Sequence, residues 1–222
     1  MAEQLLLDLP VRTALGRDDF FVSAANAAAV AGIEAWQDWP HGKMILVGPE
    51  ASGKTHLAHV WAGMSGAEVI GPDAIAARRP DTVGSALVVE DADRIADKES
   101  ETALFHLHNA VVGQGGRLLL TARAAPARWP LSLPDLASRM QQAGVVKLDG
   151  PDDALLSAVM VKLAADRQLA LGPDLISYAV LRMERSFAAA RALVEAIDTR
   201  ALRDKSRPTK PMIAALLAEI GD

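Results

Sequence analysis

The chain has 222 residues; half of them are hydrophobic, 23 % are charged, and the formal net charge is −5. This composition is that of an ordinary folded protein and excludes wholesale disorder, while the negative charge argues against nucleic-acid binding through a broad basic surface. The absence of cysteine excludes disulfides, thiolate metal ligands and a cysteine nucleophile, and no apolar run approaches the roughly 18 residues of a membrane span, so we expect a cytoplasmic protein without membrane contact.

The first ten residues form a short leucine-rich segment that is interrupted by acids. Gln4 is followed by Leu5, Leu7 and Leu9 at alternate positions, and Pro10 closes the segment. It has neither the basic start nor the apolar length of a signal peptide. Two structures fit it: an extra strand packed on the domain, or an extended peptide that binds a partner. Pro10 favours the peptide, because proline resists continuing a central strand.

Five short aliphatic runs have the pattern of buried parallel strands. They lie at 43–47, 67–70, 85–89, 117–121 and 144–148. Helical spacing occurs between them, at 56–61 and at 101–112. Strands that alternate with helices predict an α/β fold built on a five-stranded parallel sheet.

After residue 150 no strand pattern is present, and helix signals follow one another. Asp152 is a predicted helix cap. The helices that we expect run from 152 to about 167, from 172, from 186 to about 202, and from 210. The sequence therefore predicts a tail at 1–11, an α/β nucleotide-binding domain at 12–150 and a small all-helical lid domain at 151–222.

The strand at 43–47 is followed by the pattern G-x-x-x-x-G-K-[ST]. Its residues are Gly48, Pro49, Glu50, Ala51, Ser52, Gly53, Lys54 and Thr55. Glycines let backbone N–H groups curl around a phosphate, the lysine reaches the β- and γ-phosphates, the hydroxyl ligates Mg²⁺, and the next helix directs its positive end at the anion. The pattern predicts a site for ADP or ATP with Mg²⁺, and we count the adjacent His56 with it.

A second motif follows the strand at 85–89, where Glu90 and Asp91 stand at the carboxyl end. In phosphate-loop proteins the first acid of such a pair holds Mg²⁺, and a second can orient the attacking water. The usual first acid is aspartate, so here either Glu90 holds the metal with adjusted geometry or Asp91 does. We predict a metal site formed by Thr55, Glu90 and Asp91, and the sequence leaves hydrolysis open.

Taken together, these features resemble the AAA+ domain of DnaA, the bacterial replication initiator. The segments that carry the resemblance are the phosphate loop, Glu90 with Asp91, 105–109, 119–121 and 136–139. The lead-in at 19–22, followed by Asn26, is similar to the family's segment that packs near the adenine. This similarity implies that Phe21 and Val22 contact the base.

Two departures from the initiator narrow the resemblance. A DnaA initiator continues beyond its lid into a basic helix-turn-helix domain, which this sequence does not show. Gln4 to Leu9 looks like the Q-L-x-L-x-L peptide that binds the replication sliding clamp. The combination resembles the Hda-type regulators, which inactivate DnaA. This implies that Gln4, Leu5, Leu7 and Leu9 bind the clamp, and that the protein promotes ATP hydrolysis by DnaA and prevents re-initiation. DNA would be contacted only through partners, and self-association stays open.

The resemblance also implies roles for three arginine positions. Arg139 matches the arginine finger, which would reach a neighbour's γ-phosphate and joins Glu90 and Asp91 as a catalytic candidate. The family's first sensor reads T-S-D, whereas this chain has Thr121, Ala122 and Arg123, so polar readout of the γ-phosphate is weakened there. Arg185 and Arg191 flank the region of the second sensor, and Arg185 is our candidate, although an ungapped match places Ala188 at that site. These departures imply weak intrinsic ATPase activity at most. A self-sufficient ATPase or loader in DNA replication is the main alternative, and a small-molecule kinase is a third.

Overall fold

The structure is a computed structural model, and it describes residues 22–221. Residues 26–149 form one compact unit, and the helices that follow Gly150 form another. Each unit is described by itself.

The first unit is built on a sheet of five parallel strands in the order β2-β3-β4-β1-β5. The strands are β1 (Lys43–Val47), β2 (Glu68–Ile70), β3 (Ala86–Val89), β4 (Arg117–Ala122) and β5 (Gly144–Lys147). The predicted five-stranded parallel sheet is confirmed, and each strand lies within a residue or so of its expected bounds. All residues of β1 and β3 are buried, which explains why these strands are apolar on both faces.

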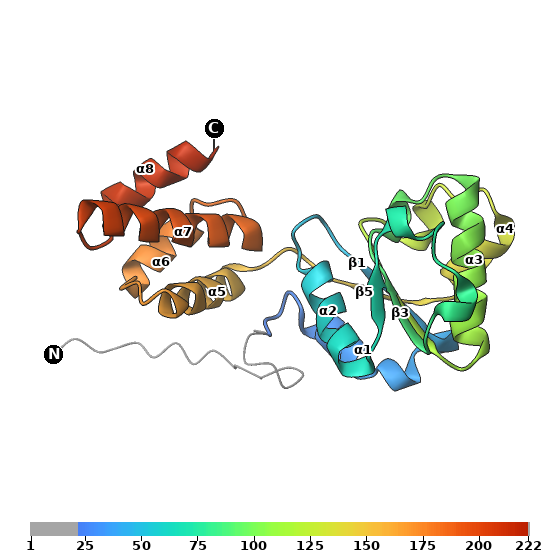
Figure 1. Cartoon of the computed structure of the whole chain (residues 1–222). Coiled ribbons are helices and arrows are strands. Elements are labelled where there is room, and N and C mark those ends of the chain that lie inside the picture. Colours follow the sequence, from blue (N-terminus) through green and yellow to red (C-terminus); the bar gives the residue numbers. More distant parts are fainter. Residues whose placement is uncertain (1–21, 222) are drawn as a thin grey trace. The chain divides into compact units, whose positions relative to one another are not determined.

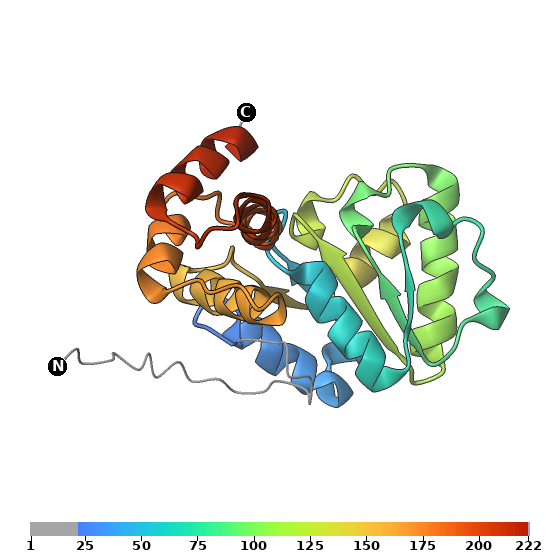
Figure 2. The same cartoon turned by 60° about the vertical axis from the view of Figure 1, so that its left-hand side comes forward.

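Four helices cover the two faces of this sheet. They are α1 (Ala27–Glu34), α2 (Lys54–Ser65), α3 (Lys98–Gly113) and α4 (Pro134–Gln141). In both views α1 and α2 lie on one side of the sheet and α3 on the other (Figure 1, Figure 2). The sequence pattern did not predict α1 or α4 as helices. The α1 segment is almost uniformly small and apolar, and the Pro134-Asp135 start of α4 was not used.

The core of this unit consists of alternate strand residues packed against the helices. Ile45, Leu87 and Leu118 belong to one hydrophobic cluster with Leu104 and Leu107 of α3. Successive strand residues point to opposite faces, so the intervening positions pack beneath α1 and α2.

On that second face, aromatic side chains extend the core. The ring of Trp61, which is fully buried in α2, lies 4.9 Å from that of Trp39. The indole N–H of Trp39 donates to the carbonyl oxygen of Gly32, at 2.7 Å, and so satisfies a buried polar atom.

The second unit is entirely helical over the part of the chain that the structure describes. Its helices are α5 (Asp153–Asp166), α6 (Pro173–Val180), α7 (Phe187–Asp204) and α8 (Lys210–Gly221). Asp152 caps α5 by accepting from the amide of Leu155, and Ser186 caps α7 by accepting from the amide of Ala189. The unit has its own hydrophobic core, to which all four helices contribute. The expected all-helical segment after the sheet is confirmed. No helix in residues 22–221 has the length and apolar character that crossing a membrane requires.

Candidate functional site

Three loops meet at the carboxyl edge of the parallel sheet. Because β4 lies between β3 and β1, the segments that leave these three strands are neighbours. Val47 pairs with Ala122, and Val89 pairs with Leu120, so the strands also end at nearly the same height. Ligands of open parallel sheets bind at this edge. The predicted phosphate loop, the acid pair and the segment at 123 are thus brought together.

The phosphate loop follows a path that needs its glycines. A Cβ atom on Gly48 would lie 2.2 Å from the carbonyl oxygen of Leu148, so no larger residue fits there. The amide of Gly48 donates to the carbonyl oxygen of Ala122, at 3.1 Å, which ties the loop to the end of β4. Gly53 has a φ of 94° and Ala51 a φ of 56°, so the main chain turns sharply before α2 begins. This is a curled loop that leads into a helix N-terminus, as phosphate binding requires.

Lys54 is held inside this loop. Its Nζ donates to the carbonyl oxygens of Gly48 at 2.8 Å and Pro49 at 2.7 Å, and the residue is only 7 % exposed. Burial lowers the pKa of Lys54, and the nearby Asp91 carboxylate works in the opposite direction. The ammonium is therefore held by carbonyl groups at the start of the loop, within the segment that phosphates are expected to occupy.

Three buried oxygens at this edge have no protein partner among residues 22–221. They are Oγ of Ser52, Oε1 of Glu90 and Oδ1 of Asp93, which lies two residues after Asp91. An unpaired buried polar atom is costly, so each fits a site that a polar ligand completes. A hydroxyl in the loop suits a phosphate oxygen, and a carboxylate suits a phosphate-bound Mg²⁺. The residues present therefore fit a magnesium nucleotide.

The acid pair sits at the end of β3 with a strained backbone. Asp91 has a φ of 46°, and its amide donates to Oγ1 of Thr121 at 3.0 Å. The Asp91 carboxylate lies 3.6 Å from the Arg94 guanidinium. In residues 22–221 no three His, Asp or Glu side chains form a ready metal cluster. A Mg²⁺ ion would take the hydroxyl of the exposed Thr55, one acid and phosphate oxygens, which is its usual mode of binding.

Asp93 and Arg123 also belong to this edge; Arg123 lies in the first-sensor segment expected from the resemblance, whereas Asp93 was not predicted. One carboxylate oxygen of Asp93 accepts from the amides of Arg123 at 2.8 Å and Ala124 at 3.1 Å. The guanidinium of Arg123 in turn lies 3.0 Å from the carboxylate of Glu50 in the phosphate loop. Two features of the sequence pointed to these residues: Asp93 is an acid two positions after Asp91, and Arg123 is basic where the family has an acid.

Arg139 lies elsewhere in the first unit. Its guanidinium is stacked over the ring of Phe105 from α3, 5.1 Å from the centroid. Its charge also acts on Lys43 at the amino end of β1, whereas the phosphate loop follows the carboxyl end of that strand. Arg139 therefore does not join the phosphate site of its own chain.

The remaining candidates are distributed over the chain. Arg185 belongs to the second unit, between α6 and α7, where it pairs with Asp153 of α5. His56 is exposed in the first turn of α2, and Val22 is partly buried. The other predicted contacts, Phe21 and the tail residues Gln4, Leu5, Leu7 and Leu9, lie outside the described residues.

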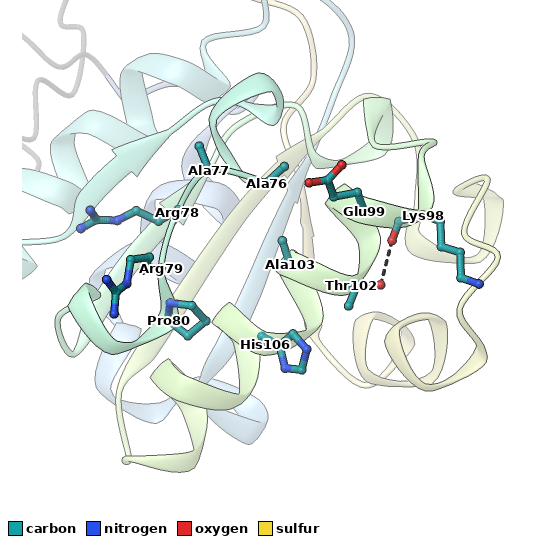
Figure 3. Close-up of a pocket in the computed structure, with 10 residues that line it drawn as sticks. All are labelled: Ala76, Ala77, Arg78, Arg79, Pro80, Lys98, Glu99, Thr102, Ala103 and His106. Carbon is teal, nitrogen blue, oxygen red and sulfur yellow. Dashed lines mark hydrogen bonds between the residues drawn. The ribbon is translucent and has the colours of Figure 1, made fainter.

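The first unit also contains an open hollow away from the phosphate loop (Figure 3). It has a volume of about 670 Å³ and lies between residues 76–80 and the first turns of α3. Pro80 and Ala103 contribute to its apolar lining, and Arg79 and His106 also line it. No residue of the phosphate loop or acid pair lines it, so it is separate from the candidate site.

No family model matches the sequence. Among solved structures, domain III of the replication initiation protein DnaA from Thermotoga maritima has a TM-score of 0.78 at 16 % identity, covering 95 % of this chain and 98 % of that one. A replication initiator DnaA bound to AMPPCP and single-stranded DNA has a TM-score of 0.71 at 16 % identity, covering 88 % of this chain and 69 % of that one. RuvB from Thermotoga maritima has a TM-score of 0.67 at 17 % identity, covering 88 % and 69 %. The chain therefore has the fold of an AAA+ P-loop NTPase, like that of DnaA domain III.

Proposed function

We propose that the protein is a nucleotide-binding AAA+ regulator of replication initiation. The observation that carries the nucleotide is the phosphate loop: Gly48 has no room for a side chain, and the ammonium of Lys54 is held by the loop's own carbonyl groups. ADP or ATP would bind there; Thr55 and one acid of the pair would hold a Mg²⁺ ion, which would offset phosphate charge. One DnaA of similar fold is bound to AMPPCP, which supports the same ligand class.

In the finer form of the proposal, the protein acts through partners. The peptide from Gln4 to Leu9 binds the sliding clamp, and the AAA+ unit contacts DnaA and promotes hydrolysis of its ATP. Arg139 supplies the guanidinium that approaches the partner's γ-phosphate. Its position away from the phosphate loop of its own chain supports action on a neighbouring nucleotide. The similarity of fold to DnaA domain III supports a module that pairs with DnaA.

Nucleotide binding is tested by melting the protein with and without Mg·ADP or Mg·AMPPCP. A ligand that binds only the folded state raises its stability by roughly 2.7 kcal/mol at a hundredfold excess over Kd. We expect this stabilisation for the wild type and its loss in Lys54→Ala, which removes a charge and a donor together. Lys98→Ala, an exposed lysine at the start of α3, is the matched control. A Lys54→Ala protein with unchanged affinity contradicts the proposal.

One observation favours the alternative of a self-sufficient ATPase. The unpaired Oε1 of Glu90 stands at the nucleotide edge, with Asp91 beside it, so both acids of a hydrolytic pair are present. Steady-state ATP turnover by the protein alone separates the two functions. A regulator has little turnover until DnaA is added. A self-sufficient ATPase turns over without partners and loses this activity in Glu90→Gln.

A further inference from the structure

An ion pair connects the phosphate loop to the end of β4. The guanidinium of Arg123 lies 3.0 Å from the carboxylate of Glu50, the third residue of the loop. β4 separates β1 from β3, so Arg123 stands between the loop that holds Lys54 and the strand end that holds the acids. We expect the terminal phosphate of a nucleoside triphosphate to lie between the phosphate loop and these acids, because it must contact both the lysine and the metal.

The charges at this edge are unbalanced toward the negative. Its cations are Lys54, Arg123 and Arg94, which lies beside Asp91, and its carboxylates are Glu50, Glu90, Asp91 and Asp93. The charges of Glu50, Asp91, Asp93 and Arg123 all act on the Lys54 ammonium, so these groups share one neighbourhood. A third phosphate adds more negative charge to this set. Arg94 lies beside Asp91, whereas Arg123 reaches the phosphate loop itself and can offset this charge together with Lys54.

Arg123 is fixed through its backbone and free to change partner through its side chain. Asp93 holds the amides of Arg123 and Ala124, which pins the main chain. The side chains of Arg123 and Glu50 are 51 % and 74 % exposed, and an ion pair so exposed contributes little stability. A guanidinium makes stronger, two-pronged hydrogen bonds to phosphate oxygens. A phosphate that comes within reach of the Arg123 guanidinium would therefore bind it more strongly than the exposed Glu50 carboxylate does.

We propose that Arg123 is a specificity-determining residue that distinguishes ATP from ADP. When ATP is bound, the Arg123 guanidinium releases the Glu50 carboxylate and binds the terminal phosphate. When ADP is bound, the guanidinium stays paired with Glu50. A positive charge thus stands at the position where the family pattern has an acid. The inference rests on the proposed nucleotide site and adds to it a means of distinguishing the two nucleotides.

The test is calorimetric titration of the full chain with Mg·ADP and, separately, with Mg·AMPPCP. Arg123→Ala is expected to weaken AMPPCP binding about tenfold or more, the usual effect of losing a charge-assisted hydrogen bond, and to leave ADP binding nearly unchanged. Glu50→Gln is expected to strengthen AMPPCP binding, because its competing charge is gone. In Arg123→Ala/Glu50→Gln that gain disappears, since the two side chains act through one contact. Arg128→Ala, an exposed arginine of the same loop, makes the same charge change and is expected to leave the ratio of affinities unaltered.

The outcomes separate this inference from the proposed function. If Arg123→Ala binds both nucleotides as the wild type does, or weakens both equally, the specificity role is overturned and nucleotide binding stands. If Glu50→Gln strengthens AMPPCP binding equally with and without Arg123, the competition is overturned. If the wild type binds neither nucleotide, the proposed function and this inference fall together.

Discussion

The side-chain nitrogen of Lys43 lies 3.2 Å from Nε2 of His108, and both residues are 2 % exposed. The other ring nitrogen of His108 lies 3.2 Å from Oδ1 of Asn109. A neutral ring with its proton on Nδ1 satisfies both contacts, because Nδ1–H then donates to Asn109 and Nε2 accepts from the lysine ammonium. Burial lowers the pKa of His108 from 6.5 to about 4; the Asn109 contact opposes this, and the charges of Lys43 and Arg139 add to it.

The first prediction is that the free energy of unfolding falls in acid because His108 takes up a proton. The unfolded chain takes up a proton near pH 6.5 and the folded one only near pH 4, so the unfolded state binds more protons between these values. The stability associated with neutral His108 is therefore complete above pH 6.5 and is lost as the pH falls toward 4, by up to roughly 3 kcal/mol. Urea unfolding of the wild type between about pH 7.5 and 4.5 measures the slope.

The slope is expected to become shallower in His108→Gln, which keeps an amide beside Lys43 without titrating. His106→Gln, an exposed histidine on the same helix, is expected to leave the slope as it is. Equal slopes in His108→Gln and the wild type are incompatible with a buried neutral ring.

A second prediction concerns Glu101, which is 1 % exposed in α3. Its carboxylate accepts from the amide of Leu133 at 2.7 Å and from the amide and hydroxyl of Ser132 at 3.0 Å, just before α4 begins. Burial by itself raises the pKa of Glu101, but these hydrogen bonds outweigh it and hold the pKa below its usual value.

Glu101→Gln is expected to lower the free energy of unfolding by roughly 1–3 kcal/mol, because an amide replaces one acceptor oxygen with a donor. Glu99→Gln, exposed on the same helix, changes the charge equally and is expected to be neutral. Denaturant unfolding of both variants measures the difference, and equal midpoints would mean that the carboxylate does not hold α4.

A third prediction tests Arg139 in its proposed role. Arg139→Ala is expected to keep the fold and nucleotide binding, since the side chain contacts Phe105 and not the phosphate loop. Stimulation of ATP hydrolysis by DnaA is expected to fall steeply; finger arginines elsewhere contribute about 10³ to 10⁵ in rate. The measurement is phosphate release by DnaA with clamp-loaded DNA and each variant. Arg128→Ala is the control, and full stimulation by Arg139→Ala excludes the finger.

The fourth prediction separates the two structures that fit the leucine-rich tail. Deletion of residues 1–9 is expected to abolish clamp binding and leave the melting temperature unchanged, because short linear peptides bind through a few anchors. A tail packed as a strand would instead produce marked destabilisation when deleted. Gln4→Ala and Leu7→Ala are the point versions, and clamp pull-down with thermal melting distinguishes the outcomes. A stable deletion variant that still binds the clamp contradicts the peptide.

Elements with a strong local pattern were predictable from the sequence. The aliphatic strands, the phosphate loop and the cap at Asp152 are all local signals, and each appears where expected. The short helices α1 and α4 were missed: α1 is almost uniformly small and apolar, and the Pro134-Asp135 start of α4, which is like the start of α6, was not used.

Contacts between distant residues were not predictable in this way. His108 meets Lys43 across 65 positions, and Asp93 meets the amide of Arg123 across 30. Only the pairing of the strands brings these residues together. The role of Arg123 in the site therefore became visible with the order β3-β4-β1, although its unusual charge was evident from the sequence.

That strand order also sets the order of events as the protein is made. Both sheet neighbours of β1 come later in the chain, and Lys43 finds its partner Leu118 only after β4 has been synthesised. Such distant parallel pairing is slow, because a long loop must close before the contacts form. A growing chain thus carries its phosphate-loop sequence well before the strand that supports Gly48 exists. A nucleotide that binds this loop can stabilise only a chain in which β1 already pairs with β4. It therefore stabilises the completed sheet and not the early stages of folding.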